Sequence, residues 1–193
     1  NGGEKFIFSS TCDEYGIKNK IQNIDENNFC RPKSFYGKSK NEVSNFLSEN
    51  FKYRSIILRN FFVCGPGENK KKLLSYIIES LKNQTKVHLK RPDDLIDFID
   101  VRDVSKIIFQ FAVDDNFGIF NVGSSTINTP LDLTKKIMRM KGISKSSNLI
   151  YFDKQKNKIR FISNNSKLKN TLKYEIKYNI DRTINDLLKS YDV

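Results

Sequence analysis

The residues best suited to chemistry are a tyrosine and a lysine four positions apart. Tyr36 and Lys40 follow a strand-like run, 5–9, which leads to the hydroxyl of Thr11. On a helix this spacing places the phenol and the ammonium on one face, and a nearby cation favours the phenolate, which can exchange a proton with a substrate hydroxyl. A chain of 193 residues with 8 Tyr and 26 Lys produces this spacing about once by chance, so the alternative is a helix start with a solvated lysine. The surrounding elements therefore decide between the two interpretations.

Length and composition indicate a globular chain. Its 193 residues, 38% of them hydrophobic, suit one domain with a real core or a large part of a two-lobed one. No run approaches the roughly 18 apolar residues of a membrane span, and residues 1–4 lack the basic and apolar regions of a signal peptide. We therefore expect a cytoplasmic protein with no membrane partner.

Cysteine and histidine usage argues against metal and disulfide chemistry. Cys12, Cys30 and Cys64 are odd in number and lack metal-ligand spacing. The single histidine, His88, lies in an alternating apolar strand, where histidine is more often structural than catalytic. The sequence therefore predicts reduced thiols and no metal site.

The net charge of +12 raises the question of a nucleic-acid partner. The lysines are scattered through the chain, however, and accompany many Asn and Ile residues, as in a general compositional bias. The densest run, 69–72, precedes apolar residues at helical spacing and is typical of a solvated first helical turn. Its weaker interpretation is attraction of an anionic substrate, and a nucleic-acid partner is disfavoured.

Apolar periodicity alternates between strands and helices along the whole chain. Alternation at this spacing predicts an α/β fold with parallel strands. The polar segment 16–33, with Pro32 near its end, is typical of an active-site loop. Expected strands are 5–9, 55–62, 86–89, 119–122 and 149–152, and expected helices are 36–49, 72–83, 104–113, 131–140 and 180–191.

Five motifs follow one another in an order that is typical of one family. They are hydroxyl residues followed by Tyr-Gly, a Tyr-x-x-x-Lys helix start, a strand that leads into Gly-Pro-Gly, an Asp-Phe-Ile-x-Val-x-Asp-Val run and an Asn-Val-Gly turn. Together they resemble the extended short-chain dehydrogenase/reductases that act on nucleotide sugars, the NAD-dependent epimerase/dehydratase family. The motifs lie in 8–16, 32–40, 58–68, 97–104 and 120–124, and 172–191 resembles the closing helix.

The resemblance covers only the C-terminal part of such an enzyme. It implies that residues 1–68, with the Tyr-x-x-x-Lys helix, are the C-terminal part of a Rossmann-like dinucleotide-binding domain with a parallel sheet. Residues 69–193 would form mainly a smaller substrate-binding α/β lobe, with segments near 97–123 that return to the first domain. The glycine-rich turn that binds a dinucleotide pyrophosphate has no counterpart, and Gly65-Pro66-Gly67 is better interpreted as a turn between lobes. Without the first half the sheet has an unpaired edge strand, so we expect a partner chain to cover it, and a homodimer.

The resemblance also implies roles for the site residues. In the family a tyrosine is the acid/base toward the C4 oxygen of the sugar, a lysine favours its phenolate and binds the nicotinamide ribose, and a Ser or Thr hydroxyl shares the substrate proton. These roles fall on Tyr36, Lys40 and Thr11, although Thr11 also suits a capping hydroxyl. The residues expected to bind the cofactor, NAD or NADP, are Ser9, Ser10, Tyr36, Lys40 and Phe61.

Substrate contacts are expected from Thr11, Asp13, Phe62 and Arg160. Phe62 stands where relatives often have an Asn, and Ile96 where an Arg commonly precedes Asp-Phe, so an amide and a bidentate diphosphate contact are lost. Arg160 is the candidate for the remaining positive charge, with Lys90 and Arg91, which are close in sequence to Ile96, as alternatives.

The loop after the first strand bears on the reaction. Hexose dehydratases of the family usually place Asp-Glu directly after the Thr, whereas Cys12 comes first here and Asp13 and Glu14 follow, which disfavours dehydration. The Thr-Cys-x-Glu-Tyr run, together with Arg-x-Phe-Phe before Gly-Pro-Gly-Glu, resembles the branch of the family that reduces 4-keto nucleotide sugars. The resemblance thus implies an NAD(P)-dependent oxidoreductase acting at C4 of a nucleotide-activated sugar, a 4-keto sugar reductase, with a nucleotide-sugar 4-epimerase as the alternative. From another class, the alternatives are a non-catalytic basic binding module, with salt-sensitive affinity for nucleic acid, and an inactive fragment.

Overall fold

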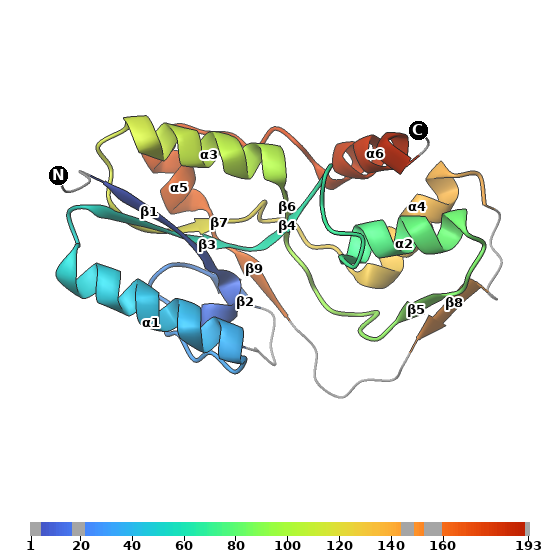
Figure 1. Cartoon of the computed structure of the whole chain (residues 1–193), viewed down its shortest axis with the longest axis horizontal. Coiled ribbons are helices and arrows are strands. Elements are labelled where there is room, and N and C mark those ends of the chain that lie inside the picture. The colour runs from blue at the N-terminus through green and yellow to red at the C-terminus, as the bar shows by residue number, and fades with distance from the viewer. Residues whose placement is uncertain (1–4, 17–21, 144–148, 153–159, 192–193) are drawn as a thin grey trace.

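The computed structural model describes residues 5–16, 22–143, 149–152 and 160–191, which form two adjacent lobes (Figure 1). The lobe that contains the first strand is built on a three-stranded parallel sheet in the order β1-β3-β7. Helix α1 covers one face, and α3 and α5 cover the other (Figure 1). The elements are β1 (Phe6–Thr11), β3 (Ser55–Asn60), β7 (Gly118–Val122), α1 (Phe35–Asn50), α3 (Val101–Val113) and α5 (Ser166–Leu172).

The central strand β3 is buried at every position, and its apolar centre is the run Ile56-Ile57-Leu58. Its alternate residues Ile56 and Leu58 share one core with Ile107 and Phe111 of α3. The rings of Phe111 and Phe120 lie 4.6 Å apart between their centroids, so they join α3 to β7. This packing fixes the strand ends that carry the candidate site.

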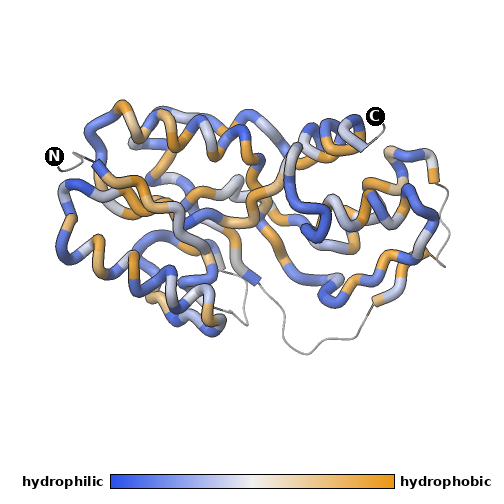
Figure 2. Tube along the Cα trace, viewed as in Figure 1, coloured by the Kyte–Doolittle hydropathy of each residue, from blue (hydrophilic) through white to orange (hydrophobic). Residues whose placement is uncertain are grey.

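The second lobe packs three amphipathic helices with a pair of short parallel strands. In α2 the buried residues Leu74, Ile77, Ile78 and Leu81 repeat at helical spacing and form one apolar stripe. Figure 2 shows apolar positions recurring between polar ones along these helices. The elements are α2 (Leu73–Lys82), α4 (Pro130–Met140), α6 (Ile180–Tyr191), β5 (Val87–Leu89) and β8 (Ile150–Phe152).

Two further parallel strand pairs lie where the lobes meet. Strand β4 (Phe62–Cys64) begins two residues after β3 ends and pairs with β6 (Phe98–Asp100), while β2 (Gln22–Ile24) pairs with β9 (Phe161–Ser163). Just before β6, the fully buried carboxylate of Asp97 accepts hydrogen bonds from the backbone N–H groups of Ser124 and Ser163, at 2.8 and 2.9 Å. The joint between the lobes is therefore held by a buried acceptor.

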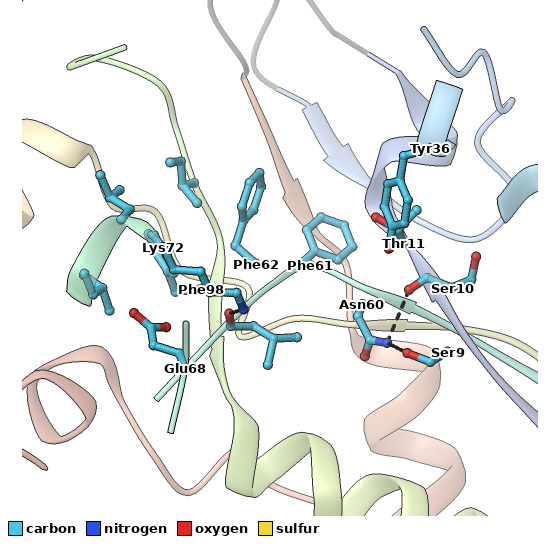
Figure 3. A pocket seen from close by; sticks show the side chains of 14 residues that line it. Ser9, Ser10, Thr11, Tyr36, Asn60, Phe61, Phe62, Glu68, Lys72 and Phe98 are labelled. Atoms are coloured by element: carbon cyan, nitrogen blue, oxygen red, sulfur yellow. Dashed lines mark hydrogen bonds between the residues drawn. The ribbon is translucent and has the colours of Figure 1, made fainter. Parts of the chain in front are cut away.

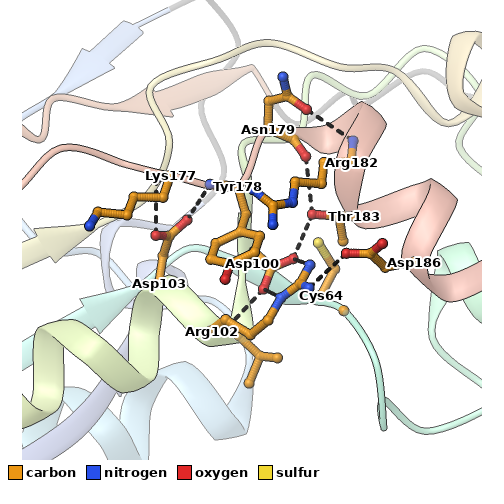
Figure 4. A network of polar contacts seen from close by, with 12 residues as sticks. Cys64, Asp100, Arg102, Asp103, Lys177, Tyr178, Asn179, Arg182, Thr183 and Asp186 are labelled. Atoms are coloured by element: carbon orange, nitrogen blue, oxygen red, sulfur yellow. Dashed lines mark hydrogen bonds and ion pairs between the residues drawn. The ribbon is translucent and has the colours of Figure 1, made fainter.

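A second carboxylate ties α3 to α6 (Figure 4). Asp100 caps α3 by accepting the N–H of Arg102 at 2.8 Å, and it also accepts the Thr183 hydroxyl at 2.6 Å. The Arg102 guanidinium bonds both Asp100 and Asp186 of α6 at 2.7 Å. Burial raises the pKa of Asp100, but the hydrogen bonds from Arg102 and Thr183 outweigh it and bring the pKa below the ordinary 3.8.

The predicted α/β fold with parallel strands is confirmed, and each expected strand and helix is present with ends displaced by at most three residues. Helix α3 begins at Val101, three residues early, because Asp100 caps it. The segment 16–33 is not a loop throughout, since it contains β2, and residues 17–21 lie outside the described part. Within the described ranges, no helix is both long and apolar enough to cross a bilayer.

Candidate active site

The candidate site lies where neighbouring parallel strands end. Thr11 is the last residue of β1, Asn60 is the last residue of β3, and the two are paired in the register. Ligands of open α/β sheets bind in the crevice outside the carboxyl ends of the strands. The topology therefore directs the groups at these ends into one space.

Thr11 has two functions in its local structure. Its Oγ1 accepts the N–H of Asp13 at 3.2 Å, so it caps the single-turn helix η1 (Cys12–Tyr15). The capping interpretation of Thr11 is thus confirmed, but that bond uses a lone pair of the oxygen and not its proton. The hydroxyl can still donate to a group in the crevice.

The start of α1 is held close to η1. Ser34 caps the helix by accepting the N–H of Gly37 at 2.9 Å. A Cβ on Gly37 would lie 2.9 Å from the carbonyl oxygen of Asp13, so this approach requires glycine. Tyr36 is the preceding residue, and its ring, half exposed, lines the crevice with Thr11 (Figure 3).

Lys40 is oriented by three contacts. Its Nζ donates to the carbonyl oxygen of Ser9 at 2.9 Å and lies 4.7 Å from the centroid of the Phe8 ring. The same ammonium lies 5.9 Å from the centroid of the Tyr36 ring. The predicted helical pair therefore meets on one face and is fixed to the end of β1.

The crevice itself is a cleft of about 420 Å³ between the lobes. One side carries polar groups, among them Ser9, whose hydroxyl accepts a hydrogen bond from Asn60 Nδ2 at 3.0 Å. The other side is mostly aromatic and aliphatic (Figure 3). The residues that line it are Ser9, Ser10, Thr11, Tyr36, Asn60, Phe61, Phe62, Val63, Glu68, Lys72, Leu73, Leu74, Ile96 and Phe98.

A buried ion pair supports the floor of the cleft. The fully buried carboxylate of Glu14 accepts from Arg59 Nε at 2.8 Å and from the hydroxyls of Ser10 and Ser44. Burial raises the pKa of the Tyr15 phenol, which lies against Arg59, and this disfavours its phenolate. Tyr36 is thus the better placed phenol for proton transfer, and Glu14 is committed to a structural network.

The other predicted site residues differ in placement. Phe61 and Phe62 line the cleft, and so does Ser10, although its hydroxyl is bonded to Glu14. Asp13 lies on η1 and Arg160 forms a bridge with Leu95, and neither is among the residues that line the cleft. Their expected substrate contacts remain predictions.

Several lining residues were not predicted. Asn60 ends the strand that pairs with β1, so the strand register is the signal that could have found it. Lys72 is the last residue of the basic run 69–72 and donates to the carbonyl oxygen of Val63 at 2.8 Å. Glu68 and Phe98 reach the cleft through tertiary packing, for which the local sequence holds no signal.

The described residues contain no group of three or more His, Cys, Asp or Glu side chains that could hold a metal ion. Burial raises the pKa of the Cys12 and Cys64 thiols, so both are poor thiolate ligands and nucleophiles. The chemistry of the cleft rests on its hydroxyls, phenol and ammonium.

Sequence comparison defines the family. The family model described as "NAD dependent epimerase/dehydratase family" matches residues 1–123, more than half of the chain. The chain therefore belongs to this family, as its motifs predicted. A search of curated protein sequences found no match.

Solved structures confirm the fold. The chain is similar to dTDP-glucose 4,6-dehydratase from Bacillus anthracis in complex with NAD (21% identity, TM-score 0.88, 97% of this chain and 61% of that one). It is also similar to UDP-glucose 4-epimerase from Thermotoga maritima with UDP-glucose (23% identity, TM-score 0.87, 99% of this chain and 64% of that one). A third similar structure is RMD from Pseudomonas aeruginosa complexed with NADPH (17% identity, TM-score 0.84, 99% of this chain and 68% of that one). The chain thus spans about three fifths to two thirds of the length of these proteins.

Proposed function

We propose that the protein to which this chain belongs is an NAD(P)-dependent oxidoreductase that acts at C4 of a nucleotide-linked sugar, as a 4-keto sugar reductase. The observation that carries the proposal is the cleft shared by Tyr36 and Thr11, with the Lys40 ammonium 5.9 Å from the centroid of the Tyr36 ring. Membership of the family, and similarity to structures that hold NAD, NADPH or UDP-glucose, support it.

The polar side of the cleft fits the nicotinamide end of a dinucleotide. An ammonium has three N–H donors, and one of those on Lys40 bonds Ser9, so the others suit ribose hydroxyls. Asn60 Oδ1 is a buried acceptor with no hydrogen-bond partner among the described residues, and it suits the amide donor of a carboxamide. A reduced nicotinamide bound there supplies the hydride.

The side chains of this chain then manage the proton. Tyr36 donates its phenolic proton to the oxygen at C4 when that carbon is reduced, so the carbonyl becomes an alcohol. Thr11 donates a hydrogen bond to the same oxygen, and the Lys40 cation stabilises the tyrosinate that remains. The Phe61 and Phe62 rings exclude water from the reacting carbon.

A nucleotide-sugar 4-epimerase is the second candidate, because the same three groups serve it and the fold matches UDP-glucose 4-epimerase at a TM-score of 0.87. A reductase consumes one NAD(P)H for each product molecule, whereas an epimerase interconverts two sugars with no net consumption. Cofactor stoichiometry with the full-length protein separates the two reactions.

The role of Tyr36 is tested in the same full-length protein. Tyr36→Phe removes the transferable proton and is expected to lower kcat by about 10² or more. Tyr53→Phe, at an exposed tyrosine just after α1, is the matched control and should leave kcat unchanged. Equal kcat in Tyr36→Phe and the wild type would refute both candidate functions.

A further inference from the structure

The ammonium of Lys40 is held in place without being neutralised. Its Nζ lies 4.7 Å from the centroid of the Phe8 ring and 5.9 Å from that of the Tyr36 ring, and it donates to the carbonyl oxygen of Ser9 at 2.9 Å. Among the residues that the structure describes, no carboxylate forms an ion pair with it. Two aromatic rings and one carbonyl dipole therefore orient this charge, and none of them cancels it.

The lack of a counter-charge matters for the phenol. A carboxylate in contact with the ammonium would repel the phenolate of Tyr36 and offset much of the attraction that the ammonium exerts on it. An aromatic ring does this far less, because its face carries only the partial negative charge of a quadrupole. The positive charge of Lys40 thus stays available to Tyr36 and to the hydroxyls of a ribose.

The strand places Phe8 on the side of the sheet that faces α1. Side chains alternate along β1, and Ile7 packs into the core that contains residues of α3. Ser10, two residues after Phe8, has its Oγ 3.3 Å from the Oγ of Ser44 on α1. Lys40 is one helical turn before Ser44, so the strand and the helix bring the Phe8 ring and the ammonium together.

The simpler interpretation of Phe8 is apolar packing. In the described part of the chain, however, Phe8 is only partly buried and belongs to none of the apolar core clusters, although its neighbour Ile7 packs against one. A leucine would cover a similar area of α1. What the phenylalanine adds at this position is a ring face beneath a cation.

We propose that Phe8 is a positioning residue for the reaction. Its ring holds the Lys40 ammonium between the end of β1 and Tyr36, where the cation stabilises the tyrosinate and binds the ribose of the nicotinamide. Phe8 is not among the residues that line the cleft, so it acts through Lys40 and not by contact with the sugar. This inference rests on the proposed function.

The experiment weakens the ring face and keeps its shape. Full-length protein is produced with mono-, di- or trifluorophenylalanine in place of Phe8, because each fluorine withdraws electron density from the ring face and changes the size of the ring little. Oxidation at C4 with NAD⁺ or NADP⁺ gives kcat and KM, on the sugar that the wild type oxidises fastest in a panel of hexoses and 6-deoxyhexoses linked to uridine, thymidine or guanosine diphosphate. Calorimetry gives the Kd of the cofactor.

We expect a graded response. In this direction C4 gives a hydride to the cofactor and its hydroxyl gives a proton to the Tyr36 phenolate, so kcat should fall with each added fluorine, by about 3- to 10-fold in total. The Kd of the cofactor should rise in the same order, and the KM of the sugar should stay within about 2-fold of the wild-type value.

Three variants show that the ring face is responsible. Phe8→Leu removes the ring and should lower kcat at least as much as trifluorophenylalanine does, whereas Phe8→Tyr keeps the ring and should stay within about 2-fold of the wild type. The matched control is trifluorophenylalanine in place of Phe109, a residue of α3 that is 68% exposed, and it should leave kcat and Kd unchanged.

The outcomes separate the two proposals. If the three fluorinated proteins match the wild type while Tyr36→Phe loses turnover, the positioning role is overturned and the proposed function stays supported. A loss in Phe8→Leu with no gradation among the fluorinated proteins indicates apolar packing and also overturns the role. If the wild type oxidises no sugar of the panel at C4, the proposed function is overturned, and the inference with it.

Discussion

The pair formed by Glu14 and Arg59 offers a direct test of how the floor of the cleft is held. Both side chains are buried, at 0% and 5% exposure, and their atoms meet at 2.8 Å. Glu14→Gln keeps the shape of the side chain and removes its charge. The Arg59 guanidinium then stays buried without a counter-charge, and the amide must choose between accepting from Arg59 and accepting from the hydroxyls of Ser10 and Ser44.

The expected loss is large for one substitution. Breaking a buried ion pair by removing one partner costs about 3–5 kcal/mol, and we expect about 3 kcal/mol because the amide keeps part of the hydrogen bonding. For a domain of this size, that loss corresponds to a decrease in Tm of roughly 6–12 °C. Replacing both partners, as in Glu14→Met with Arg59→Met, removes the isolated charge and should be less destabilising than Glu14→Gln alone.

Denaturant unfolding followed by circular dichroism gives the free energy of unfolding for each variant. Glu79→Gln is the matched control, because its ion pair with Lys70 is exposed and should contribute about 0–1 kcal/mol. If Glu14→Gln loses no more stability than Glu79→Gln does, the ion pair does not hold the floor and the reasoning is wrong.

Three further substitutions test the supports of the site. Gly37→Ala brings a Cβ within 2.9 Å of the Asp13 carbonyl oxygen, so it should displace the start of α1 and lower kcat by about 10-fold or more. A wild-type kcat in steady-state kinetics would contradict the close approach. Gly123→Ala brings a Cβ within 2.8 Å of the Asp97 carboxylate and should cost about 1–3 kcal/mol of unfolding free energy, and no loss in denaturant unfolding would show that the joint adapts. The pKa of Asp100 in the folded protein is below its ordinary value of 3.8. The carboxylate therefore contributes to the unfolding free energy above pH 3.8, and this contribution is lost as the pH falls through the folded-state pKa. The difference in unfolding free energy between wild type and Asp100→Asn should therefore shrink below pH 3.8, and a difference that does not change with pH would refute the assignment.

The longer elements could be predicted from the sequence because their burial follows a regular period. Helix α2 buries residues at helical spacing, and β3 is an unbroken buried run. Strands β2, β4, β6 and β9 have three residues each, too few to show a period, and β2 pairs with β9 across more than a hundred residues of chain. Tertiary pairing, and not local propensity, makes these segments strands.

The same distinction applies to the site. Thr11, Tyr36 and Lys40 belong to local motifs, so the sequence could indicate them, and the helix and strand register then brought them together. The partner of Glu14 lies 45 residues away, so nothing local indicated that this carboxylate is buried and paired. Lys72 looked like part of a solvated basic turn until packing of α2 placed it at the cleft.

The position of the apolar side of the cleft depends on the joint between the lobes. Phe62 belongs to β4, and its partner strand β6 ends at Asp100, a buried carboxylate that binds α3 of the first lobe and α6 of the second. Because Thr11 and Tyr36 come from the first lobe, the distance between their side chains and Phe62 is set by this joint. A change at Asp100, which is not among the residues that line the cleft, should therefore alter kcat/KM as well as stability, whereas a change at exposed Phe109 should alter neither.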